Sequence, residues 1–158
     1  MSDTAERIAV IRDYVPRLEA LVAGLSIEQL TTPYNAPEWT IAQNIHHLVD
    51  SHMTSYLRFK RMIVEDNPTV RGYNQDAFAG LPDAKDAHIT DSLMILRGLH
   101  ARWARMLNNI EDWSRTCYHD EAQKTISLDD MLNAYVRHCN AHIQQIQEVL
   151  DKMPRDAS

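Results

Sequence analysis

The stretch that decides the fold is TIAQNIHHLVDSHMTSYLRFKRMI, residues 40–63. It begins with a capping-box pattern, in which Thr40 and Gln43, three residues apart, close the first turn of a helix. The residues that follow place apolar side chains at spacings of three and four, as an amphipathic helix does. This stripe, which includes one histidine, consists of Ile41, Ile45, Leu48, His52, Tyr56, Phe59 and Ile63. We therefore predict a long helix over residues 41–65.

Three further amphipathic segments accompany this helix. Apolar periodicity predicts helix one over residues 5–25 and helix three over residues 90–110. Ser127-Leu128-Asp129-Asp130 resembles a capping box with Asp in place of Glu, and helix four follows it to about residue 152. The apolar spacing in helix four suits packing at a shallow angle in a bundle. The fold class we predict is all-α, with residues 1–158 forming one four-helix bundle domain.

The connections between these helices differ in length. A capping box at Ser26-Ile27-Glu28-Gln29 predicts a short turn of helix after helix one. Residues 66–89 form a long connection between helices two and three, with one short helix at 74–79. A connection of this length in a compact domain is often functional, so these residues are a candidate lid over a site. Residues 115–127 are predicted to form a small β-hairpin.

Composition and charge exclude several classes of function. The formal net charge is −6 and the basic residues form no stripe, so we expect no nucleic-acid partner. No apolar run approaches the roughly 18 residues that span a bilayer, so we expect no membrane partner. The N-terminal residues are polar and carry no signal-peptide core, which favours a cytoplasmic protein. Cys117 and Cys139 are accordingly expected to be reduced thiols.

The eight histidines are the unusual feature of the composition. His138 and His142 stand four residues apart in helix four, and a helix brings such positions onto one face. This is the spacing of the histidine ligands in helical zinc sites, although a third ligand has to come from another helix. The alternative is that the two histidines satisfy each other, or backbone groups, at the edge of the bundle.

Helix two offers three candidates for that further ligand, His46, His47 and His52. On a helical wheel His52 lies at the centre of the apolar stripe, so helix geometry favours it for the interior. His47 lies far from that stripe, on a polar face with Gln43, Asp50, Ser51 and Arg58. A polar face could line the open cleft that a catalytic metal ion needs, so periodicity leaves both candidates open. His100 faces inward on helix three, and we interpret it, like His52, as a core histidine, with a role in the site as the alternative.

The segment from Trp39 to Met53 resembles the helix-two signature of the DinB/YfiT-like family, whose members are described as metal-dependent hydrolases and include bacillithiol transferases. The likeness continues through residues 55–60 and 65–69, and it resumes at residues 99–103 and 135–146. The resemblance implies a DinB-like four-helix bundle with a three-histidine metal site. By position in the motif it implies His47 as the ligand from helix two and His138 and His142 as the ligands from helix four. It thus overrides the preference for His52.

Three imidazoles leave a divalent ion, zinc or nickel, with open coordination positions, as in catalytic sites. Such an ion could activate water for hydrolysis of a small-molecule substrate, or hold a low-molecular-weight thiol for transfer to an electrophile. Asp50, three residues after His47, is the candidate catalytic residue, because it could contact a ligand or act on a bound water. Its alternative is a solvated helix charge.

The rival hypothesis is a non-catalytic, stress-linked bundle in which the metal ion only joins helix two to helix four. The resemblance also implies a homodimer. Tyr14, Leu57 and Met94 are the apolar residues that we expect at the surface.

Overall fold

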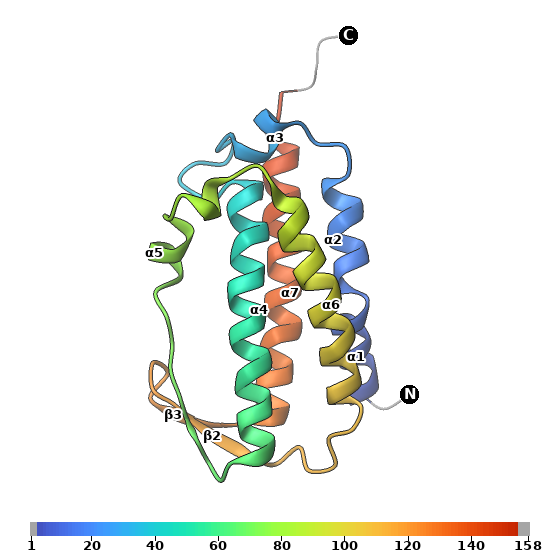
Figure 1. The fold of residues 1–158 in the computed structure, drawn as a ribbon, viewed down its shortest axis with the longest axis vertical. Helices are drawn as coiled ribbons and strands as arrows, with labels where there is room; N and C mark the ends of the chain where they lie inside the picture. Colours follow the sequence, from blue (N-terminus) through green and yellow to red (C-terminus); the bar gives the residue numbers. More distant parts are fainter. Residues whose placement is uncertain (1–2, 155–158) are drawn as a thin grey trace.

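The computed structural model describes residues 3–154, which form a bundle of four helical rods (Figure 1). The first rod consists of α1 (Asp3–Arg12) and α2 (Tyr14–Val22), and the others are α4 (Ile41–Val64), α6 (Ile89–Leu107) and α7 (Leu128–Asp151). The first rod and α7 run in one direction, whereas α4 and α6 run in the other. The predicted four-helix bundle is therefore confirmed, and the parallel course of α4 and α6 explains the long connection between them.

The first rod departs from the prediction of one helix over residues 5–25, because it breaks at Asp13. Pro16 accounts for the break: it has no N–H, and its ring collides with the carbonyl of Arg12, four residues earlier. Tyr14, which follows the break, is fully buried, so the expectation that it lies at the surface is wrong. Leu57 and Met94 are exposed as expected.

The three predicted capping boxes are all present and start the helices that follow them. In each, the side-chain oxygen of the first residue accepts a bond from the backbone N–H three residues on, and that residue's side chain accepts a bond from the first residue's N–H. The pairs are Ser26–Gln29 before α3 (Ile27–Thr31), Thr40–Gln43 before α4 and Ser127–Asp130 before α7. The box at Thr40 fixes where α4 begins, and hence where its histidines lie.

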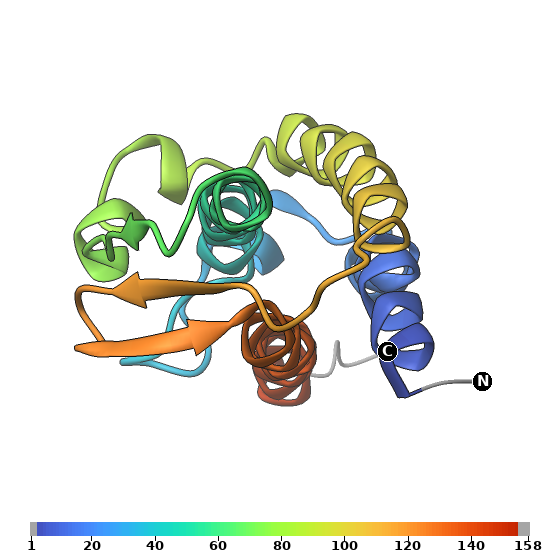
Figure 2. The same ribbon diagram turned by 90° about the horizontal axis from the view of Figure 1, so that it is seen from below.

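The connection between α4 and α6 contains β1 (Thr69–Val70), α5 (Gln75–Ala79) and the short 3-10 helix η1 (Asp83–Lys85). The predicted hairpin is confirmed as β2 (Thr116–His119) and β3 (Lys124–Ser127), which pair antiparallel. β1 pairs parallel with β2, so the sheet has the order β1-β2-β3. Figure 2 shows α5 and the sheet beside α4 and α7, outside the bundle. They therefore cover the side on which these two helices face each other.

The core between the rods is mainly apolar and lies apart from the polar side of α4. Its fully buried members include Ile11, Leu18, Ile45, Leu48, Phe59, Trp103, Leu132 and Ile146. Cys117 and Cys139 are buried and free. Among the described residues, no helix combines the length and the apolar character that crossing a membrane requires.

Candidate metal centre

His47, His138 and His142 converge between α4 and α7. Each offers one ring nitrogen, and the three nitrogens lie within 4.8 Å of one another. The Nε2 atoms of His47 and His138 are 3.4 Å apart, and the ring centroids of His138 and His142 are 4.5 Å apart. The structure thus brings together the three histidines that the family resemblance implied as ligands. Their binding of a metal ion stays a prediction.

The helices place these side chains for simple geometric reasons. His138 and His142 lie one turn apart on α7 and so project in one direction. On α4, the apolar stripe packs into the bundle. The polar face points toward α7, and it carries Asn44, His47 and Ser51, which are spaced three and four residues apart. His47 and His142 are buried, while His138 is half-buried.

Burial keeps the three imidazoles neutral at pH 7. It lowers the pKa of His47 and of His138 to about 4. Burial, reinforced by the two neighbouring imidazoles, lowers the pKa of His142 to about 2. The negative charge of Asp76 opposes this effect at His47 by raising its pKa. A neutral imidazole keeps a lone pair on one nitrogen, which is the form that binds metal ions.

The orientation of His142 is fixed by Asn44. The amide nitrogen Nδ2 of Asn44 donates to the backbone oxygen of Thr40 over 3.0 Å, which leaves its Oδ1 facing His142. Oδ1 can only accept, so the Nδ1–H of His142 donates to it over 2.8 Å. The lone pair of His142 is therefore on Nε2. Hydrogen bonding of the distant ring nitrogen is typical of histidines that bind metal ions.

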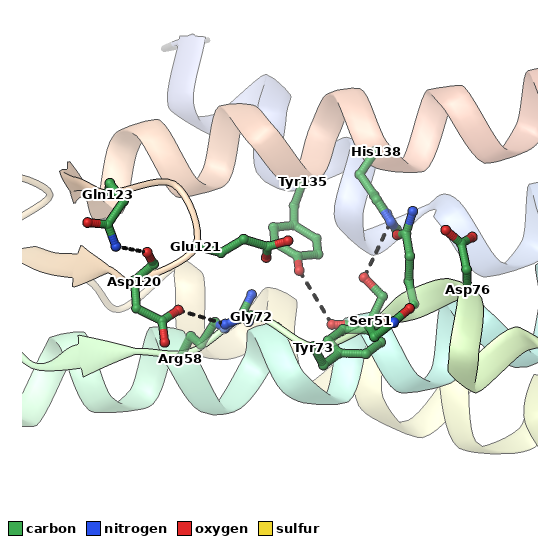
Figure 3. Close-up of a pocket in the computed structure, with 12 residues that line it drawn as sticks. Ser51, Arg58, Gly72, Tyr73, Asp76, Asp120, Glu121, Gln123, Tyr135 and His138 are labelled. Carbon is green, nitrogen blue, oxygen red and sulfur yellow. Dashed lines mark hydrogen bonds between the residues drawn. The ribbon is translucent and has the colours of Figure 1, made fainter.

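The other two histidines also have partners on their outer nitrogens. His138 turns Nδ1 toward His52, 3.2 Å away, and Nε2 toward His47. The hydroxyl of Ser51 lies 3.3 Å from the same Nε2 atom (Figure 3). The Nδ1 atom of His47 is 3.5 Å from the hydroxyl of Tyr73, so this contact is the loosest of the three. Three neutral imidazoles with inward-facing nitrogens form a donor set that fits a divalent ion such as zinc, with positions left open.

Two cavities lie beside this centre, and their linings share His138, Gln75 and Asp76. The first measures about 910 Å³, and Figure 3 shows it between α4, α7 and the sheet. Its other polar lining residues include Arg58, Tyr73, Asp120, Glu121 and Tyr135. The second measures about 760 Å³ and is bordered by Trp39, whose ring lies 4.7 Å from that of His47. His138 thus borders both cavities, and His142 borders the second.

Asp50, the candidate catalytic residue from the sequence, is half-buried on α4. Burial raises the pKa of its carboxyl, and the nearby charge of Asp83 adds to this effect. Within the described residues, Asp50 lines neither of the two cavities, so its catalytic role stays a prediction. The carboxylate that does reach both cavities is Asp76 on α5, which acts on the charge of His47.

Asn44, Tyr73 and Asp76 contact or border the centre but were not predicted from the sequence. Asn44 had a signal, because it stands three residues before His47 on the same face of α4. Asp76 and Tyr73 had none beyond their place in the long connection, since their position at the centre depends on how that connection folds back. His52, the choice from the helical wheel, is fully buried in the core and lies behind His138.

The comparisons with known proteins agree with this geometry. The sequence model of the DinB superfamily matches residues 15–146. A Bacillus subtilis protein described as "Putative metal-dependent hydrolase YfiT" is 38% identical over 148 residues, which cover 92% of this chain and 83% of that protein. A Bacillus pumilus protein described as "Putative metal-dependent hydrolase" is 42% identical over 136 residues. These residues cover 85% of this chain and 77% of that protein.

A solved structure shows the same arrangement of helices. It is that of YfiT from Bacillus subtilis, described as "a probable metal-dependent hydrolase with an unusual four-helix bundle topology". It matches with a TM-score of 0.91 and 36% sequence identity, over 97% of this chain and 90% of the other.

Proposed function

The chain belongs to the DinB superfamily, and from that premise we propose that it is a metal-dependent enzyme whose divalent ion, zinc or nickel, is held by His47, His138 and His142. One observation carries the proposal: three neutral imidazoles from two helices converge, and one of them, His138, borders two cavities. The relatives described as metal-dependent hydrolases support hydrolysis as one activity.

When bound, the divalent ion would supply Lewis acidity, which activates water for hydrolysis and stabilises the thiolate of a thiol substrate. Each neutral histidine would give its one lone pair to the ion and could not also accept a proton, so another group has to accept the proton of the nucleophile. We assign this role to Asp76, because its carboxylate lines both cavities and its negative charge raises the pKa of His47. Asp76 takes the proton as the nucleophile attacks, and it returns the proton to the leaving group when the bond to that group breaks.

The finer choice lies between hydrolysis of a small molecule and transfer of a low-molecular-weight thiol, of the bacillithiol type, to an electrophile. The two cavities favour transfer, because two organic reactants can approach the centre from separate sides. Hydrolysis needs room for only one organic substrate, because its second reactant is water.

The rival function, a stress-linked bundle with a structural ion, fits the geometry less well. Structural zinc sites are closed by four protein ligands, whereas the group found among the described residues has three. The apolar core also packs the four rods independently of this group.

The test is a turnover screen with protein loaded with zinc or nickel. One arm pairs low-molecular-weight thiols with monochlorobimane, and the other uses panels of esters and amides. We expect turnover that chelation abolishes and metal restores. Asp76→Asn should lower kcat by about 10²- to 10⁴-fold with the bound metal retained. Asp50→Asn tests the sequence-based candidate, and Asp91→Asn, on the exposed side of α6, is the control.

Two results would overturn the proposal. One is wild-type protein that retains neither zinc nor nickel after dialysis against the ion. The other is turnover that persists unchanged in His138→Ala. If metal-loaded protein turns over esters or amides but gives no thiol-dependent product, transfer is excluded and hydrolysis stands. The expected homodimer and cytoplasmic location stay predictions from the sequence.

A further inference from the structure

A row of buried histidines leads from the candidate metal centre into the core. Nδ1 of His138 lies 3.2 Å from Nε2 of His52, and Nδ1 of His52 lies 2.8 Å from Nε2 of His100. Nδ1 of His100 lies 2.6 Å from the backbone oxygen of Ile11. The row thus passes from α7 through α4 and α6 to α1. His52 is 0% exposed and His100 is 1% exposed, and neither belongs to the group that could hold a metal ion.

The carbonyl at the end of the row sets the direction of every hydrogen bond in it. A carbonyl oxygen only accepts, so Nδ1 of His100 must carry a hydrogen. In neutral His100 the Nε2 atom then accepts, and the Nδ1–H of His52 donates to it. By the same step, Nε2 of His52 accepts from the Nδ1–H of His138. The lone pair of His138 is consequently on Nε2, the nitrogen that faces His47 at 3.4 Å.

The opposite direction would require a second proton on His100. That proton would place a positive charge between the rings of Tyr14 and Trp103, whose centroids lie 5.4 Å and 5.7 Å from that of His100. Among the described residues, no carboxylate forms a hydrogen bond or ion pair with His100 or His52. Burial favours the neutral form of His100 and lowers its pKa to about 4. Reversal would also put a hydrogen on the Nε2 atom of His138 and block it as a ligand.

We propose that His52 and His100 are positioning residues that fix the tautomer of His138 against the carbonyl of Ile11, so that its Nε2 lone pair faces the metal ion. The inference rests on the proposed function, because the Nε2 lone pair of His138 matters only if that atom binds a metal ion. The break at Asp13 lies two residues beyond Ile11, so the carbonyl that ends the row sits beside the irregular point of the first rod. Loss of such an outer partner typically weakens metal binding by about 10- to 100-fold.

The first test is nitrogen-15 NMR of the histidine rings in metal-free wild-type protein at pH 7. We expect His138, His52 and His100 each to carry the hydrogen on Nδ1. A hydrogen on Nε2 of His138 would overturn the inference. Because this measurement uses no metal and no substrate, it can fail while the proposed function holds, and it can succeed when no turnover is found.

The second test compares variants of His100 by zinc titration against a chromophoric chelator. His100→Leu removes the row's link to Ile11, and we expect zinc to bind about 10- to 100-fold more weakly. His100→Gln should restore affinity to within about threefold of wild type, because its amide can donate to the carbonyl and accept from His52. Tyr14→Phe is the matched control, since it alters the same buried pocket but removes a hydroxyl with no hydrogen-bond partner among the described residues.

The ring tautomers of His138 and His142 in His100→Leu show whether His100 positions His138 or only fills space in the core. In His100→Leu we expect His138 to populate both tautomers, while His142 keeps its hydrogen on Nδ1 because Asn44 holds it. A folded His100→Leu protein with an unchanged His138 tautomer and unchanged zinc affinity would overturn the inference. If this variant does not fold, the wild-type NMR measurement decides the question.

Discussion

Each histidine of the centre is oriented by a different neighbour, and these neighbours differ in how firmly they hold it. His142 donates to Asn44 over 2.8 Å, whereas His47 lies 3.5 Å from the hydroxyl of Tyr73. Asn44 belongs to a rigid helix, while Tyr73 belongs to the connection before α5. The orientation of the His47 ring therefore depends on how that connection is folded, whereas His142 is held by a helix residue.

The buried histidines also predict how stability depends on pH in the metal-free protein. In the unfolded chain they take up a proton near pH 6.5, whereas in the folded protein His47, His100 and His138 do so only near pH 4. The unfolded state thus binds more protons between these values, and the free energy of unfolding falls as pH falls. Each such histidine contributes a slope of up to about 1.4 kcal/mol per pH unit.

Urea unfolding at pH 7, 6 and 5 checks this expectation. The slope should be shallower in His100→Gln by up to about 1.4 kcal/mol per pH unit, because one titrating group is gone. A free energy of unfolding that does not change between pH 7 and pH 5 would contradict the burial of these groups as neutral imidazoles.

The sequence could predict part of the centre because part of it is local. The spacing of His138 and His142 depends only on one helix. The choice between His47 and His52 depended on which helix packs against each face of α4. The apolar periodicity of one helix does not reveal its neighbours. Only the family resemblance selected His47. Asp76 could not be predicted, because its position at the centre depends on the fold of a connection.

At the scale of elements, Gln43 joins α4 to α5. Its Oε1 accepts from the backbone N–H of Thr40 in the capping box, and its Nε2 donates to the backbone oxygen of Ala79 over 2.8 Å. Gln43→Glu keeps the first bond and removes the donor of the second. We expect α4 to stay intact while α5, which carries Asp76, opens more easily by about 1 kcal/mol.

Hydrogen exchange measures this difference directly. Amides of α5 should exchange about fivefold faster in Gln43→Glu, and those of α4 should be unchanged. KM and kcat should change together if α5 acts as a lid. Gln29→Glu is the matched control, because Gln29 has the same place in the capping box of α3. Unchanged exchange in α5 would show that this bond does not hold the segment.

Elements defined by local patterns were predicted well, and those defined by contacts between distant segments were not. The capping boxes and the hairpin have signals within a few residues of one another. The parallel pairing of β1 with β2 joins Thr69 to Tyr118, and nothing near either residue indicates it. The break at Asp13 had a local signal in Pro16, and the apolar periodicity on both sides of it masked that signal.

At the scale of the whole molecule, the apolar core and the candidate centre are separate sources of stability. The bundle should therefore stay folded when the metal ion is removed. At a free-ion concentration of 100 times Kd, binding adds about 2.7 kcal/mol. For a chain of this size we expect chelation to lower Tm by about 5–11 °C.

Thermal melts with and without a chelator, followed by circular dichroism, test this expectation. The control is His138→Ala, whose Tm should not respond to the chelator. Loss of helical signal at room temperature on chelation would favour the structural-ion hypothesis.

The parallel course of α4 and α6 has a further consequence. The chain leaves α4 at one end of the molecule and must enter α6 at the other, a return of about 36 Å along a helix of 24 residues. Residues 65–88 could reach about 80 Å if fully extended, so roughly half of that length is surplus. Residues 72–76 of this connection line the first cavity, and Gln75 and Asp76 also line the second. Changes to this connection can therefore alter which molecules the two cavities accept, while the rods that carry the three histidines keep their positions.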